Sequence, residues 1–223
     1  MESFKTIHAR AARRHGGEAA LERLLAKPKS SAALKKIPDD RWLAAMTRAV
    51  FQAGFSWKVI EEKWPGFEEA FDHFEPYHVA FYSGDDMARL ASDKRIVRNG
   101  AKIRATVENA RLIVDLAREH GSAGAFFASF APERYLELLE FLKKRGSRLS
   151  GRSAQYFLRS QGVDSFVLSE SVLAALIEAK VIDKPPSSRK AMEAVQAAFA
   201  RWRKESGRSF TEISRTLGFS IDV

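Results

Sequence analysis

The spacing of apolar residues limits the fold most strongly in this chain of 223 residues. They recur at steps of three and four, and runs that alternate apolar and polar residues are scarce. The first pattern places apolar side chains on one face of an α-helix, whereas a half-buried strand needs the second. Residues 39–55 show the helical spacing clearly, with an apolar face that runs from Trp42 to Phe51 after the N-cap candidate Asp39. The sequence therefore predicts an all-α protein of about ten helices.

Glycine, proline and capping residues divide the rest of the chain into further helical segments with short connections. Besides 39–55, we expect helices over 17–26, 57–64, 66–73, 101–119, 122–130, 133–145, 152–161, 168–179, 187–205 and 210–217, and short helices that begin near Pro76 and Gly84. Pro65 and Gly66 are expected to end one helix before the next begins.

Composition excludes several classes of protein. The chain has no cysteine, which rules out a disulfide scaffold, a thiol nucleophile and a zinc site built on thiolates. No apolar run approaches the roughly 20 residues that cross a bilayer. Residues 1–14 are basic without an apolar segment behind them, so they do not resemble a secretory signal. We expect a cytoplasmic protein without a membrane partner.

Charge is unevenly distributed along the chain. The sequence has 37 Lys and Arg against 28 Asp and Glu, a formal charge of +9, which suits a partner made of phosphates. Residues 94–104 contain five basic residues and 141–160 contain six, without one acid in either stretch. Six acids fall instead in residues 61–75. The excess positive charge is therefore predicted to gather around two turns, apart from the acidic segment.

Residues 141–160 predict a helix, a glycine-bearing turn and a second helix. Backbone N–H groups at the start of a helix, together with its dipole, bind phosphate, and glycine permits close approach. Such a turn would hold a DNA backbone without reading its sequence. The DNA-binding candidates are Lys144, Arg145, Gly146, Arg148, Gly151 and Arg152. An ordinary turn between two helices is the alternative interpretation.

Four groups of residues occur together in an order and spacing typical of one family. They are QAGFSW at 52–57, FEEAF at 67–71 with FEP at 74–76, IVRN at 96–99 with KI at 102–103 and NA at 109–110, and LKKRG at 142–146 with Gly151. Across residues 39–165 the chain thereby resembles the DNA-3-methyladenine glycosylase I family, within the helix-hairpin-helix glycosylase superfamily.

The resemblance implies a fold, a reaction and a partner. It implies the all-α helix-hairpin-helix glycosylase fold as a single domain over 1–223, with a core lobe at 39–180 and a second lobe from 1–38 and 181–223. It implies hydrolysis of the N-glycosidic bond of alkylated purines such as N3-methyladenine, after the nucleotide has been flipped out of the duplex. The expected partner is double-stranded DNA containing alkylated bases, bound by a monomer without a cofactor.

The same resemblance assigns candidate site residues. Trp57 matches the tryptophan that stacks on the damaged base, where a π face attracts the cationic purine. Gly54 and Phe55 match the loop that enters the duplex, with Phe55 as an apolar wedge. Gln52 joins Trp57 as a catalytic candidate, and the substrate-binding candidates are Ala49, Gly54, Phe55, Ser56 and Trp57. Packing in the core is the alternative for Phe55 and Trp57.

The chain departs from the family pattern at several positions. Ala49 stands where the family has a glutamate that recognises the base, and no tyrosine precedes Tyr77 to match the family's pocket tyrosine. The family's zinc uses two cysteines and two histidines, but cysteine is absent here and Phe166 falls near the downstream histidine. We therefore expect no metal, and apolar packing by the 187–205 helix to hold the second lobe.

Two positions after the hairpin bear on the chemistry. Ser169 lies near the place of the aspartate that catalyses in related glycosylases, and Glu170 is adjacent. We interpret this pair as the start of the next helix, with catalysis by Glu170 as the alternative.

Two other functions stay open beside the glycosylase. The missing glutamate and tyrosine favour a non-catalytic relative that binds DNA or senses lesions. A helical scaffold without DNA binding would require the basic turns to be buried or paired with the acids of 61–75.

Overall fold

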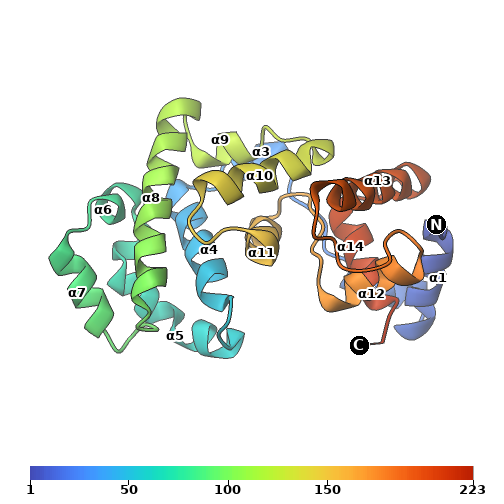
Figure 1. Cartoon of the computed structure of the whole chain (residues 1–223), viewed down its shortest axis with the longest axis horizontal. Helices are drawn as coiled ribbons and strands as arrows, with labels where there is room; N and C mark the ends of the chain where they lie inside the picture. Colours follow the sequence, from blue (N-terminus) through green and yellow to red (C-terminus); the bar gives the residue numbers. More distant parts are fainter. Residues whose placement is uncertain (223) are drawn as a thin grey trace. The chain divides into compact units, whose positions relative to one another are not determined.

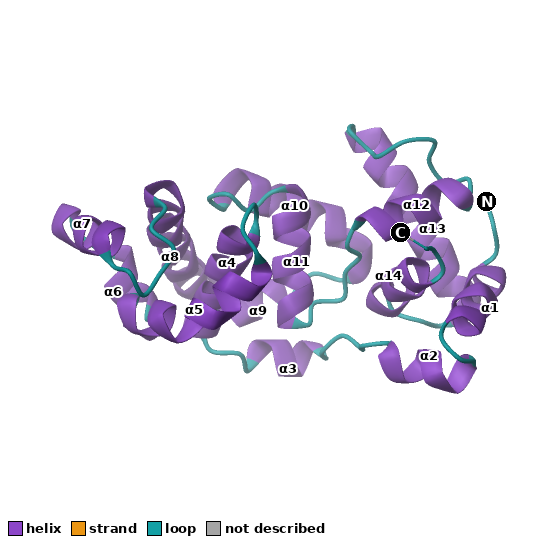
Figure 2. Cartoon of the chain, turned by 90° about the horizontal axis from the view of Figure 1, so that it is seen from below, coloured by secondary structure: helices purple, strands orange, loops and turns teal. Residues whose placement is uncertain are grey.

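The computed structural model describes residues 1–222, and its regular secondary structure is entirely helical (Figures 1 and 2). Fourteen α-helices and two short 3-10 helices lie within these residues, and no strand does. The all-α prediction is confirmed, with more helices than the ten or so expected. Within residues 1–222, no helix has both the length and the apolar character needed to cross a membrane.

The chain divides into two compact units. One comprises residues 30–130 and 138–161, and the other comprises 1–29, 131–137 and 162–223. Residues 162–180, which the resemblance places in the core lobe, belong to the unit that contains both termini.

The larger unit is built around one buried helix. Its elements are α3 (Ser31–Lys35), α4 (Asp39–Gln52), α5 (Trp57–Ala70), a 3-10 helix (Asp72–Phe74), α6 (Pro76–Ala80), α7 (Gly84–Ser92), α8 (Gly100–His120), α9 (Ala123–Phe127), most of α10 (Tyr135–Arg145) and α11 (Gly151–Gln161). Trp42, Met46 and Phe51 of α4 are fully buried, as the helical spacing predicted. Helix α4 packs against α8 and α11 (Figure 1). Its C-terminal end is therefore held in place between two other helices.

Helix α5 differs from the expected pair of helices because it continues through Pro65 to Ala70. Proline removes one backbone hydrogen bond, which usually ends or bends a helix. Here Ile60 and Phe67, on either side of the proline, are both fully buried. Tertiary packing of one continuous apolar face thus outweighs the local signal.

The second unit brings the N-terminal and C-terminal segments together. Its elements are α1 (Phe4–Arg14), α2 (Glu18–Leu24), a 3-10 helix (Pro132–Arg134), α12 (Glu170–Glu178), α13 (Arg189–Ser206) and α14 (Phe210–Phe219). Val195, Phe199 and Trp202 of α13 are fully buried, which confirms the predicted apolar packing. The Phe166 ring stacks on Phe199 at 4.5 Å between centroids. Phe166 is therefore a core residue of this unit.

Helices α1 and α3 were not predicted. Helix α1 has only three buried residues, Phe4, Ile7 and Ala11, among basic and polar ones. It packs against α13 and α14, so its stability depends on partners distant in the sequence.

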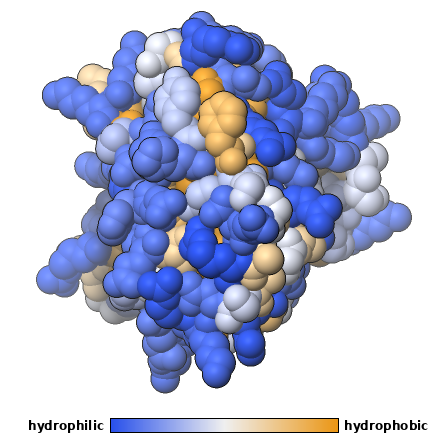
Figure 3. All heavy atoms as spheres, turned by 90° about the vertical axis from the view of Figure 1, so that its left-hand side faces the viewer, coloured by the Kyte–Doolittle hydropathy of each residue, from blue (hydrophilic) through white to orange (hydrophobic). Residues whose placement is uncertain are grey.

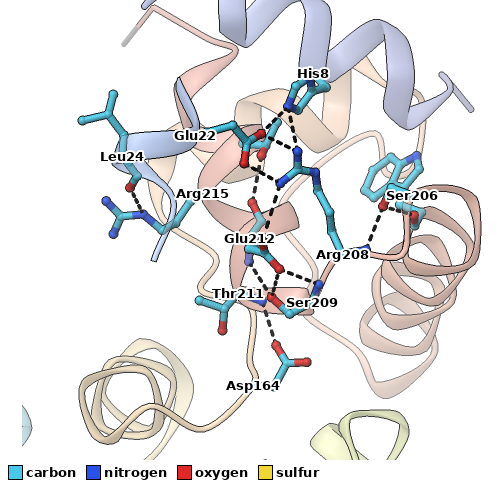
Figure 4. A network of polar contacts seen from close by, with 12 residues as sticks. His8, Glu22, Leu24, Asp164, Ser206, Arg208, Ser209, Thr211, Glu212 and Arg215 are labelled. Atoms are coloured by element: carbon cyan, nitrogen blue, oxygen red, sulfur yellow. Dashed lines mark hydrogen bonds and ion pairs between the residues drawn. The ribbon is translucent and has the colours of Figure 1, made fainter. Parts of the chain in front are cut away.

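A polar network reinforces the same unit (Figure 4). Both terminal nitrogens of Arg208 donate to the Glu22 carboxylate, which also lies 3.2 Å from Nε2 of His8. The Arg208 hydrogen bonds hold the pKa of Glu22 below its usual range, with His8 as a smaller contributor. An ion pair, in addition to apolar packing, therefore joins the N-terminal helices to the segment between α13 and α14.

Most of the molecular face in Figure 3 is hydrophilic, with a few apolar residues at its middle. The large apolar side chains exposed in the larger unit include Phe55, Trp57, Tyr77 and Phe81. Of these, Phe55 and Trp57 belong to the loop that follows α4 and to the start of α5.

Candidate functional site

A cavity of about 400 Å³ lies at the C-terminal end of α4 in the larger unit. Its lining residues are Ala49, Gln52, Ala53, Gly54, Trp57, Arg152, Ser153 and Tyr156. The structure thus brings together Ala49, Gln52, Gly54 and Trp57, which the sequence motif singled out, with Arg152 of the predicted hairpin. Ala53, Ser153 and Tyr156 were not predicted.

The loop between α4 and α5 presents the two aromatic candidates. Gly54 has a φ of +82°, a conformation that favours glycine, so the chain turns sharply after α4 ends at Gln52. Ser56 is the N-cap position of α5 and Trp57 is its first residue. Phe55 is 38% exposed and Trp57 is 50% exposed, so neither is packed in the core. Their exposure leaves both rings accessible to a ligand.

Tyr156 supplies a second aromatic wall. Its ring lies 5.1 Å from that of Trp57, at an interplanar angle of 87°. Arg152 and Tyr156 are four residues apart on α11 and therefore share one face of that helix. This spacing could have indicated that Tyr156 lies beside Arg152. The packing of α11 against α4, which brings Tyr156 to the cavity, could not be predicted from the spacing of residues along the sequence.

Lys102 of α8 binds the end of α4 and the start of the loop that follows it. Its Nζ donates to the carbonyl oxygens of Val50 at 2.7 Å and Phe51 at 3.2 Å, and also to that of Ala53. These carbonyls end α4, where a cation also complements the helix dipole. The ammonium lies 4.6 Å from the centroid of the Phe55 ring. Lys102 is therefore an internal support of the loop and not a surface charge.

Burial, together with the positive charge of Arg148, lowers the pKa of Lys102 below its usual value. The side chain is only 7% exposed. Its role was missed at the sequence level because Lys102 falls in a basic stretch that suggested phosphate contacts.

The position of the family glutamate offers the cavity no polar atom. Ala49 is 6% exposed, and the described lining of the cavity includes no carboxylate. The amide of Gln52 is the polar group that α4 contributes. Its Nε2 donates to Oε1 of Glu61 at 3.1 Å. Glu61 was not among the predicted site residues.

The predicted hairpin joins α10 and α11 through residues 146–150. A Cβ at Gly146 would lie 2.7 Å from the carbonyl oxygen of Leu142, so only glycine fits there. Gly151 has a φ of +53° and Arg148 a φ of +56°, both in the left-handed region. The hydroxyl of Ser153 donates to the carbonyls of Arg148 and Ser150, at 3.0 and 2.8 Å. The turn is therefore closely specified by its own residues.

Asn109 of α8 fixes the hairpin from inside. Its Oδ1 accepts from the backbone N–H of Ser147 at 2.8 Å, and its Nδ2 donates to the Ser147 carbonyl at 3.1 Å. Asn109 is fully buried, so these two bonds satisfy a side chain that would otherwise be costly to bury. Helix α8 thus supports both the hairpin and the loop after α4.

The basic hairpin residues lie at the surface. Lys144, Arg145, Arg148 and Arg152 are all exposed. Lys144 lies 3.1 Å from Glu140, and Arg145 lies 3.4 Å from Asp115. These two pairs are solvent-exposed and therefore weak enough to open in favour of phosphates.

The expected separation of the acidic and basic segments is partly wrong. Arg95, in the basic stretch 94–104, pairs with Glu69 at 2.8 Å and with Asp93 at 2.7 Å. Arg41 makes two hydrogen bonds to Glu68, at 2.8 and 2.9 Å. Folding brings Glu69 to Arg95 and Glu68 to Arg41 although each pair is distant in the sequence, so part of the basic stretch is neutralised.

Ser169 and Glu170 begin a helix, as the first interpretation held. The Ser169 side chain accepts from the backbone N–H of Val172 at 3.3 Å, and Glu170 is the first residue of α12. Among residues 1–222, no three His, Asp or Glu side chains are grouped in a way that could hold a metal ion.

The cavity, the loop and the hairpin all lie within one matched region. The family model described as methyladenine glycosylase matches residues 34–160, which is more than half of the chain. The chain belongs to the methyladenine glycosylase family. The resemblance inferred from the motifs between residues 52 and 151 is therefore confirmed.

Curated members of the methyladenine glycosylase family match parts of the chain. DNA-3-methyladenine glycosylase 1 of Escherichia coli is 35% identical over 65 residues, which are 29% of this chain and 35% of that protein. DNA-3-methyladenine glycosylase of Haemophilus influenzae is 26% identical over 131 residues, which cover 50% of this chain and 71% of that protein. The match to the first relative thus spans about a third of its length.

Solved structures of the family share the fold. 3-Methyladenine DNA glycosylase I of Staphylococcus aureus aligns with a TM-score of 0.53 and 23% identity, over 62% of this chain and 80% of that one. A second structure of a 3-methyladenine DNA glycosylase I aligns with a TM-score of 0.50 and 21% identity, over 62% of this chain and 83% of that one. The expected glycosylase fold is confirmed.

Proposed function

We propose that this protein is a DNA glycosylase that removes alkylated purines, of which 3-methyladenine is the first candidate, from double-stranded DNA as a monomer. One observation carries the proposal. The half-exposed Trp57 lines a cavity together with Gln52 of α4 and with Arg152, at the start of the hairpin's second helix. The proposed base pocket therefore adjoins Arg152 of the hairpin, which is a candidate for binding the phosphates of the DNA.

The pocket suits a flipped base. An enzyme that acts on a base within a duplex must first bring the nucleotide out of the stack. Methylation at N3 gives the purine a positive charge, and the π face of Trp57 attracts such a cation. Tyr156 adds a second aromatic surface at 5.1 Å from Trp57. These groups favour a flat cationic base over a neutral one.

The loop and the hairpin suit the duplex itself. Phe55 is 38% exposed, which supports its role as the wedge that enters the space left by the flipped nucleotide. The exposure of Arg145 and Arg148, beside the N-terminal turn of α11, supports their role in contacting phosphates. Phosphate contacts position the protein but carry no sequence information, which agrees with a search for rare lesions.

The reaction needs little acid–base help from the protein. A water oxygen bonds to C1′ of the deoxyribose while the bond from C1′ to N9 of the purine breaks. The electron pair of that bond neutralises the cationic base, which leaves uncharged, and the water proton passes to solvent. Because the leaving group is already activated, a cavity without a carboxylate remains compatible with this chemistry.

One observation favours a second candidate, a non-catalytic protein that binds DNA at lesions. Ala49 and the absence of a carboxylate from the described cavity lining leave no acidic side chain to activate water there. Such a protein would retain the hairpin and the wedge and would hold the flipped base without releasing it.

A paired assay separates the two candidates. The protein is incubated with methylated duplex DNA, released bases are measured by mass spectrometry, and binding to the same DNA is measured by anisotropy. We expect release of 3-methyladenine together with binding. Binding without release would establish the non-catalytic candidate, and the absence of both would overturn the two proposals together.

A further inference from the structure

Gln52 is the residue through which α4 presents polar chemistry to the cavity, since Ala49 contributes only a methyl group. An amide has a donor end and an acceptor end, and these recognise opposite groups on a purine. Which end is available to a ligand depends on what fixes the other. The neighbours of Gln52 therefore bear on which base the cavity selects.

Glu61 fixes the orientation of that amide. Its Oε1 lies 3.1 Å from Nε2 of Gln52, and its Oε2 lies 3.5 Å from Nη1 of Arg48. The guanidinium of Arg48 in turn lies 4.1 Å from the centroid of the Trp64 ring. An ionised carboxylate only accepts hydrogen bonds, so the amide must turn its nitrogen toward Glu61 and its carbonyl oxygen away.

We propose that Glu61 is a positioning residue that makes Gln52 a fixed hydrogen-bond acceptor and so selects adenine-derived over guanine-derived bases. The inference rests on the proposed glycosylase function. Adenine has an amino donor at position 6, whereas guanine has a carbonyl acceptor there. A fixed carbonyl oxygen attracts the first and repels the second.

The other polar groups of the cavity are less suited to this selection. Arg152 only donates hydrogen bonds, and the Ser153 hydroxyl proton is directed at the carbonyls of Arg148 and Ser150. The Tyr156 hydroxyl can donate or accept, so it does not distinguish the two purines by itself. Gln52, held by Glu61, is the group in the cavity lining that presents a defined acceptor.

The test compares Glu61→Gln with Glu62→Gln. A glutamine at position 61 can donate as well as accept, so it no longer fixes the Gln52 amide. Glu62 is the adjacent acid, and its exposed carboxylate lies 3.9 Å from Nζ of Lys58, so its replacement is a matched loss of charge. The initial rates of release of 3-methyladenine and 3-methylguanine are measured from the same methylated duplex DNA.

We expect the ratio of the two rates to fall by about tenfold in Glu61→Gln, which corresponds to one hydrogen bond, and to stay unchanged in Glu62→Gln. Binding to undamaged duplex and the melting temperature should stay near wild type in both, which excludes a general loss of structure.

Three other outcomes would contradict either the role of Glu61 or the proposed function. Release of both bases at an unchanged ratio in Glu61→Gln would overturn the proposed role of Glu61 but not the proposed glycosylase function. An equal fall in Glu62→Gln would overturn it as well, since charge and not amide orientation would then be responsible. No release by the wild-type protein would overturn the proposed function itself.

Discussion

At the scale of single residues, Lys102 shows how a charge that looks available for DNA is used inside the protein. Its ammonium binds the last carbonyls of α4 and lies beside the Phe55 ring. These carbonyls have no partners within the helix itself. The loop that carries Phe55 and leads to Trp57 is therefore held by one cation from α8.

We predict that Lys102→Met destabilises the protein by about 1–3 kcal/mol, because buried carbonyls lose their partner. The free energy of unfolding in urea measures this loss. Lys63→Met is the control, since Lys63 donates to the single carbonyl of Lys94, at 2.7 Å, and should cost less than about 1 kcal/mol. Equal costs for the two variants would contradict the special role of Lys102.

The motif residues of the site could be predicted, but their partners could not. Gln52, Gly54 and Trp57 lie close together in the sequence, and a shared signature identified them. Tyr156 and Glu61 reach the same region from α11 and α5. Their roles depend on how helices pack, which residue spacing along one helix does not specify.

At the scale of elements, the hairpin between α10 and α11 is specified by both its own glycines and α8. Gly146 has no room for a Cβ, and Asn109 holds the backbone of Ser147. The sequence predicted the two helices and the turn because glycines mark such a turn clearly. The contribution of Asn109 follows only from the packing of α8 beside the hairpin.

We predict that Arg148→Ala weakens binding to damaged and undamaged duplex equally and reduces the slope of log affinity against log salt by about 0.9, the value of one phosphate contact. Arg95→Ala is the control and should leave the slope unchanged, since Asp93 and Glu69 already neutralise Arg95. Fluorescence anisotropy at several salt concentrations measures both. A loss confined to damaged DNA would contradict the hairpin assignment.

The long helices were predicted closely, and the short ones less so. Residues 101–119 and 187–205 correspond to α8 and α13, because a long amphipathic pattern specifies its own buried face. The prediction that one helix ends at Pro65 was wrong, because α5 continues through that residue. Short helices such as α1 depend on packing partners that the local pattern does not contain.

At the scale of the whole molecule, the 37 basic side chains behind the net charge of +9 include some that pair with acids and others that are exposed. Arg41 and Arg95 pair with acids of the 61–75 segment. Arg148 of the hairpin is exposed, and its positive charge helps to lower the pKa of the buried Lys102. The third alternative, a scaffold whose basic turns pair with the acids of 61–75, is therefore favoured at Arg95. It is not favoured at the hairpin, where Lys144 and Arg145 pair with Glu140 and Asp115 and stay exposed.

The ion pair between Glu22 and Arg208 predicts a dependence of stability on acid pH. Because Arg208 lowers the pKa of Glu22 in the folded state, the unfolded chain binds a proton more readily. The stabilisation is complete above about pH 5 and is lost as the pH falls through the lower folded pKa.

We predict that Glu22→Gln lowers the free energy of unfolding at pH 7 by up to about 1 kcal/mol, as expected for a partly exposed pair. The difference from wild type should shrink as the pH falls below the unfolded pKa, because protonation of Glu22 removes the charge that Gln lacks. Urea unfolding at pH 7, 5 and 3 measures it, with Glu62→Gln as the control. A difference that grows with acidity would contradict the assignment.

The central claim is that Trp57 holds a damaged base in the cavity beside the hairpin, and one measurement tests it directly. The rate of 3-methyladenine release from methylated duplex DNA is measured with excess enzyme, for the wild-type protein and Trp57→Ala. We predict release by the wild type and a rate about 10- to 100-fold lower in the variant, from the loss of one base stack. Affinity for undamaged duplex should be unchanged. Release at the same rate by both proteins, or by neither, would contradict the claim.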